Sequence, residues 1–157
     1  MKKKRVVIIS LLLLLVSVIG ISSYFLFKDK MNLLDVDHSA VDWNGKKQKD
    51  TSGEENTIAI PGFEKVTLYA NETTQAVNFH NPEINDCYFK ISLIHPDGSV
   101  LWISDLIEPG KGMYSIELEK TLAVGEYENA VLKYECFSLN DQSPLNGSEI
   151  NLKLVVV

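Results

Sequence analysis

The sequence contains few of the residues on which common chemistries depend. Its 157 residues include two cysteines, five prolines and three histidines. This composition excludes collagen, a coiled coil and a disulfide-rich miniprotein. No phosphate-binding loop, zinc-protease motif, nucleophile elbow or Cys-x-x-Cys pair occurs. His38, His80 and His95 are too scattered for a metal site, so we expect neither a metal nor another cofactor.

Positive charge is also scarce after the first five residues. Residues 28–56 carry 5 basic and 7 acidic groups, and residues 57–157 carry 6 basic and 14 acidic groups. Nucleic-acid binding needs clustered lysine and arginine, so we expect no nucleic-acid partner. The same acidic balance argues against a domain that rests on an anionic lipid surface.

The one long hydrophobic run covers residues 6–27 and follows the basic residues 2–5. As a helix it would be about 33 Å long, which is enough to cross a hydrocarbon core of about 30 Å. A cleaved signal peptide has a shorter apolar region, although cleavage near Ser22 stays open. We therefore expect a single-pass signal anchor, with the N-terminus in the cytoplasm and the remaining chain outside the cell.

A polar stretch follows the predicted anchor. Residues 44–56 hold almost no apolar side chain and cannot offset their ordering entropy, so we predict a flexible extracellular stalk over residues 28–56. A short apolar patch interrupts this segment. Two explanations of the patch stay open: contact with lipid head groups, or a docking segment for a partner. The patch consists of Leu33, Leu34, Val36, Val41 and Trp43.

The pattern changes at residue 57, where short β-rich runs alternate with turn residues and helical periodicity is absent. We predict an all-β domain over residues 57–157, a seven-stranded antiparallel immunoglobulin-like sandwich. A small β-barrel is the alternative. The predicted strands cover residues 64–70, 75–80, 87–95, 99–105, 113–118, 126–137 and 148–157.

Gly125 and Tyr127, at the start of the sixth predicted strand, resemble the tyrosine corner of immunoglobulin-like sandwiches. In that corner the tyrosine hydroxyl returns to the backbone a few residues upstream. Further segments resemble short membrane-anchored surface proteins of Gram-positive bacteria that carry one immunoglobulin-like domain, a family of undefined role. The resemblance implies a fold and a cell-surface location, and no mechanism. It is carried by residues 60–63, 77–82, 87–94, 97–101, 104–111, 122–127, 133–137 and 144–147.

Cys87 and Cys136 are the only cysteines. Cys87 shares its alternation phase with Phe89, and Cys136 shares its phase with Tyr134. In an immunoglobulin-like order their strands are antiparallel neighbours, and the start of one lies beside the end of the other. We predict a disulfide between them, because oxidation is permitted outside the cell. The alternative is a pair of buried free thiols.

Trp102 is the remaining candidate for recognition. A central tryptophan in this fold usually belongs to the core, but an exposed Trp102 beside Tyr88 would form a contact patch. We expect a membrane-anchored extracellular interaction module, accessory or adhesive, which has no catalytic activity and binds another surface or secreted protein. The alternative is an inhibitor-like or assembly-chaperone module that pairs through an edge strand. The last predicted strand ends at Val157 and is a candidate for that edge.

Overall fold

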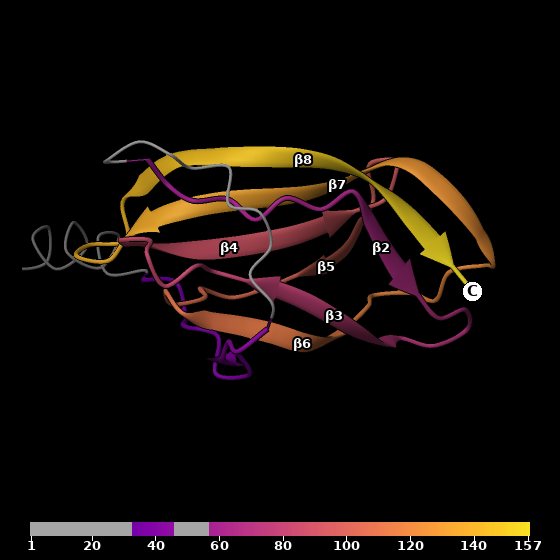
Figure 1. Ribbon diagram of the computed structural model, residues 1–157, viewed down its shortest axis with the longest axis horizontal. Helices are drawn as coiled ribbons and strands as arrows, with labels where there is room; N and C mark the ends of the chain where they lie inside the picture. Colours follow the sequence, from indigo (N-terminus) through magenta and orange to yellow (C-terminus); the bar gives the residue numbers. More distant parts are fainter. Residues whose placement is uncertain (1–32, 46–56) are drawn as a thin grey trace, which may run out of the picture. The chain divides into compact units, whose positions relative to one another are not determined.

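The computed structural model describes residues 33–45 and 57–157 (Figure 1). The predicted anchor at residues 6–27 and the polar part of the predicted stalk at residues 46–56 lie outside the described residues. Within the two described ranges, no helix is both long enough and apolar enough to cross a membrane. The regular elements of these ranges are β-strands, so the all-β prediction is confirmed.

The strands form two sheets (Figure 1). One sheet has the order β2-β8-β7-β4-β5 and the other has the order β1-β6-β3. Neighbouring strands are antiparallel except β2 and β8, which are parallel. The seven predicted strands correspond to β2–β8. The bounds are β1 Val41–Asp42, β2 Lys65–Leu68, β3 Thr74–His80, β4 Cys87–Ile94, β5 Val100–Ile103, β6 Lys111–Glu117, β7 Gly125–Ser138 and β8 Pro144–Val156.

The core is built by strict alternation along the central strands. In β4, Phe89, Ile91 and Leu93 point inward and are fully buried, because successive side chains of a strand face opposite sides of the sheet. Phe79 of β3 joins them from the other sheet. The indole of Trp102 packs on the ring of Phe79, with 5.8 Å between ring centroids. Both sheets therefore share one hydrophobic core, and Trp102 is part of it.

The last strand does not lie at a sheet edge. β8 is placed between β2 and β7, and Lys65–Leu68 of β2 pair in parallel with residues 153–156. The backbone N–H of Val157 donates to the carbonyl of Leu68 at 3.0 Å. The free C-terminal edge considered from the sequence is therefore not available, because β2 returns to cover it.

Residues 34–45 pack against the strands, although the sequence places them in the stalk. We call residues 35–44 the strap. Val36 forms a parallel bridge with Leu106, and β1 pairs with the start of β6 through Val41–Gly112 and Asp42–Lys111. The compact unit accordingly begins at Leu34, whereas the sequence analysis draws its boundary at residue 57.

Candidate functional site

Trp43 holds the strap on the β1-β6-β3 sheet. Its indole stacks on the ring of His80, with 3.8 Å between centroids and 10° between planes. Its Nε1–H donates to Oδ1 of Asn78 at 2.7 Å. Both partners lie on β3, so the indole crosses the intervening strand β6 above Gly112. A Cβ on Gly112 would lie 2.8 Å from Cδ1 of Trp43, which explains why glycine is needed there.

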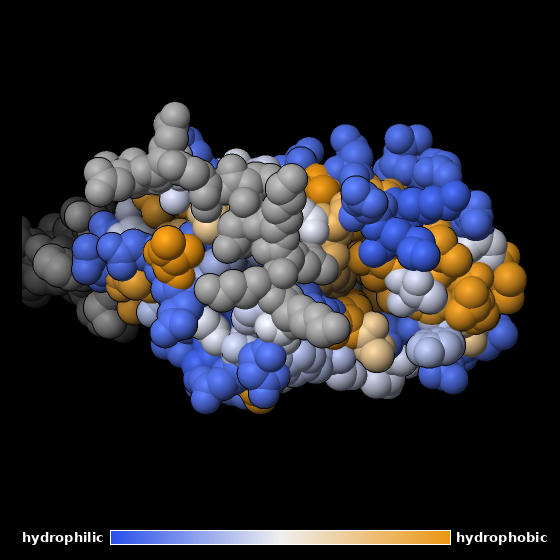
Figure 2. Space-filling view, in the orientation of Figure 1, coloured by the Kyte–Doolittle hydropathy of each residue, from blue (hydrophilic) through white to orange (hydrophobic). Residues whose placement is uncertain are grey.

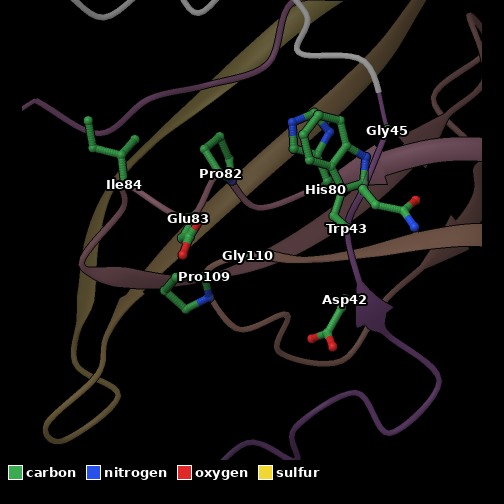
Figure 3. A pocket seen from close by; sticks show the side chains of 10 residues that line it. Asp42, Trp43, Gly45, His80, Pro82, Glu83, Ile84, Pro109 and Gly110 are labelled. Atoms are coloured by element: carbon green, nitrogen blue, oxygen red, sulfur yellow. The ribbon is translucent and has the colours of Figure 1, made fainter.

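A pocket of about 730 Å³ opens beside this tryptophan (Figure 3). One wall is formed by the end of the strap together with Gly45, residues 42–45. The opposite wall is the loop between β3 and β4 at residues 82–84. His80, Pro109 and Gly110 complete the lining. The pocket therefore joins three segments that are far apart in the sequence.

Two buried asparagines fix the loop that forms the second wall. The Asn81 side-chain amide donates to the carbonyls of Cys87 at 2.8 Å and Ile107 at 2.9 Å. The Asn85 amide donates to Oδ1 of Asn81 at 2.8 Å and to the Ala59 carbonyl at 2.9 Å. Oδ1 of Asn85 in turn accepts the Ala59 N–H at 2.7 Å. The sequence analysis missed this pair, because asparagines in a loop look solvent-exposed until their long-range partners are known.

The rim of the pocket is negatively charged. The carboxylate of Asp42 accepts a hydrogen bond from the Lys111 ammonium at 2.6 Å. This hydrogen bond and the opposite charges lower the pKa of Asp42 and raise the pKa of Lys111. Because this pair neutralises itself, the exposed carboxylate of Glu83 sets the charge of the pocket. Ile84 beside it is 79% exposed and places an apolar side chain next to the charged rim.

The contact patch predicted from Trp102 and Tyr88 does not form. Trp102 pairs with Leu93 across β5 and β4 and points into the core with it, and Trp102 is only 7% exposed. Tyr88 has the opposite alternation phase on β4 and pairs with Phe137. The two rings therefore lie on opposite faces of the sheet. The register between the strands decides which face of the sheet each ring occupies, because a shift of one residue moves a side chain to the opposite face.

The predicted disulfide is absent, and Cys87 and Cys136 are buried free thiols. Cys87 lies opposite Ser138, and Cys136 lies opposite Phe89, so the cysteines are diagonal neighbours rather than a direct pair. The two thiols still lie within hydrogen-bonding reach of each other, so the offset leaves them adjacent but not covalently bonded. A hydrogen bond between the thiols lowers the pKa of Cys87 and raises that of Cys136.

Tyr127 has the geometry of a tyrosine corner. Its hydroxyl donates to the carbonyl of Ala123, four residues upstream, at 2.9 Å. Its ring also meets the edge of His95, with 5.0 Å between centroids. Tyr127 thus ties the loop before β7 to the strand and has a structural role.

The described residues contain no group of three or more His, Cys, Asp or Glu side chains placed to hold a metal ion. No family model, no curated protein and no solved structure matches this chain.

Proposed function

We propose that this protein is a membrane-anchored extracellular interaction module, accessory or adhesive and without catalytic activity. It binds another surface or secreted protein through the pocket beside Trp43. One observation carries the proposal: the pocket is held open by fixed walls, and Ile84 stands almost fully exposed at its rim. Pre-formed recesses with an exposed apolar side chain and a polar border are typical of recognition surfaces.

We infer an immunoglobulin-like sandwich for the fold of the module. The neighbours β8, β7 and β4 match the G, F and C strands of that fold, and β3 beside β6 matches the B and E strands. The hydrogen bond of Tyr127 at the start of the F-like strand supports the same arrangement. Two separate sheets favour the sandwich over a small barrel.

The location rests on the sequence. The hydrophobic run at residues 6–27 and the basic residues 2–5 support a signal anchor with the C-terminal domain outside the cell.

The structure gives less support to edge-strand pairing. Just after the edge strand β2, the N–H and the carbonyl of Tyr69 both bond to the side chain of Gln75, at 2.7 and 2.9 Å. On the edge strand β5, the carbonyl of Leu101 accepts the N–H of Glu119 at 2.9 Å. A partner strand that adds to the five-stranded sheet at these points would have to displace these bonds.

Site-specific photocrosslinking on intact cells tests the proposal. The full chain carries a photoreactive amino acid at Ile84 or, as the matched control, at Val124. Val124 is 72% exposed and lies just before β7, at the opposite end of that strand from the pocket. We expect a protein adduct from position 84 and none from position 124. Equal adduct formation at the two positions, or none at position 84, would contradict the proposal.

A further inference from the structure

We propose that the pocket receives a basic side chain, arginine or lysine, from an extended segment of the partner protein. This inference rests on the proposed interaction function and names the chemistry of the partner. It follows from three features of the pocket: its charge, its tryptophan wall and its size.

The charge of the pocket complements a cation. The exposed carboxylate of Glu83 lies beside Gly110 in Figure 3, across from Asp42. Asp42 and Lys111 pair at 2.6 Å and cancel each other's charge, so Glu83 supplies the net negative charge of the pocket. The exposed Glu108 adds negative potential, since its charge raises the pKa of Lys111. Figure 2 shows hydrophilic side chains over the strap. A partner cation would therefore enter a field of favourable sign.

The tryptophan wall suits the same ligand. The indole of Trp43 is fixed by His80 and Asn78 and is only half-buried. Gly45 leaves it accessible, because a Cβ at that position would lie 2.9 Å from the indole Nε1. Cations bind to indole rings through the ring quadrupole, and arginine also stacks on them. The proline walls would cover the methylene stem of the basic side chain.

The size of the pocket favours a chain segment over a single ion. Its volume of about 730 Å³ is within the range of about 300–1,000 Å³ usual for ligand pockets. The exposed Ile84 at the rim adds an apolar contact for a residue next to the cation. A short extended segment with one basic residue is therefore a suitable probe of the pocket.

A defined peptide probe tests this inference on the full chain in zwitterionic nanodiscs. The probe is the blocked pentapeptide Gly-Pro-Arg-Pro-Gly, and its control has citrulline, a neutral isostere, in place of arginine. Binding is followed through the NMR signal of the Ile84 δ1 methyl group. We expect saturable binding that weakens about tenfold with citrulline, because the charge supplies both the ion pair and the cation–indole contact. Higher salt should also weaken it.

Two single substitutions test whether the arginine peptide binds at the pocket. Glu83→Gln should weaken binding of the arginine peptide about threefold, the usual scale of an exposed ion pair. Glu119→Gln, which removes an equally exposed carboxylate elsewhere, should leave it unchanged. Equal binding of the two peptides, equal effects of the two variants, or no methyl shift at any peptide concentration would overturn the inference. If photocrosslinking at position 84 succeeds while the peptide tests fail, the interaction function stands and the basic ligand does not. If the peptide binds but no adduct forms on cells, the pocket prefers a basic side chain, but the proposed use of the pocket for partner binding is contradicted.

Discussion

Replacing Asn85 by alanine should show how much the stability of the pocket depends on one buried side chain. Asn85 is 6% exposed and makes three hydrogen bonds, two with the backbone of Ala59 and one with Asn81. The substitution leaves three buried polar groups without these partners. A buried polar group that loses its hydrogen-bond partner costs about 1–3 kcal/mol, so the three groups together would cost about 3–9 kcal/mol if all of them stayed buried.

The real loss should lie below that range. Residues 57–60 precede the first strand of the large sheet, so Ala59 can turn toward water once its partner is lost, and only Oδ1 of Asn81 stays buried. We expect the free energy of unfolding to fall by about 2 kcal/mol, which lowers the urea midpoint by about 1 M. Urea unfolding of the full chain in detergent micelles, followed by tryptophan fluorescence, measures it. Asn140→Ala, in the exposed β7–β8 turn, is the control. A loss below about 1 kcal/mol would refute the reasoning, since it would mean that the network does not hold the loop.

Three further changes test other parts of the structure. Gly112→Ala should destabilise the protein by about 1–3 kcal/mol through overpacking and should shift the fluorescence of Trp43 to the red as the indole leaves β6; unchanged emission would show that the close contact is tolerated. Tyr127→Phe should lower the free energy of unfolding in urea by about 1–2 kcal/mol. An unaltered urea midpoint would show that the tyrosine corner does not stabilise the domain. The Asp42–Lys111 pair should hold the strap at neutral pH and weaken as acid protonates Asp42 below its ordinary pKa of 3.8, because a lowered folded pKa gives stability only while the carboxylate is charged. A pH above the ordinary lysine pKa of 10.5 should also weaken the ion pair, since the pKa of Lys111 is raised and the pair stabilises only while the ammonium is charged. Trp43 fluorescence across a pH series should change at both limits. A flat response would contradict the role of this pair in holding the strap.

Much of the fold could be predicted because local signals agree with the global arrangement. Alternation along β4 and the turn residues around Gly98 indicate β4 and β5 directly, and the Gly125–Tyr127 element locates the start of β7. β1 escaped prediction because a two-residue strand has no measurable periodicity. Its pairing depends on Gly112, about 70 residues away in the sequence.

The candidate site was harder to predict, because it depends on register. Trp102 faces the core since it pairs with Leu93, and a β-bulge follows at Ile94. Cys87 and Cys136 have matching phases but are offset by two residues, and the sequence contains no signal of that offset. The pocket likewise requires contacts among three distant segments, which no local pattern of residues reports.

The strap has a mechanical consequence. It lies between the predicted anchor and the two sheets, so a force that draws the domain away from the membrane passes through the strap before it reaches the core. The strap is held by two ladder pairs, one isolated bridge, a few backbone hydrogen bonds, the Asp42–Lys111 ion pair and the Trp43 contacts. By contrast, the 14-residue strand β7 is paired along both sides. The strap should peel away first under load and take one wall of the pocket with it. If the domain attaches to a partner through this pocket, the attachment would weaken under tension while the rest of the domain stays folded.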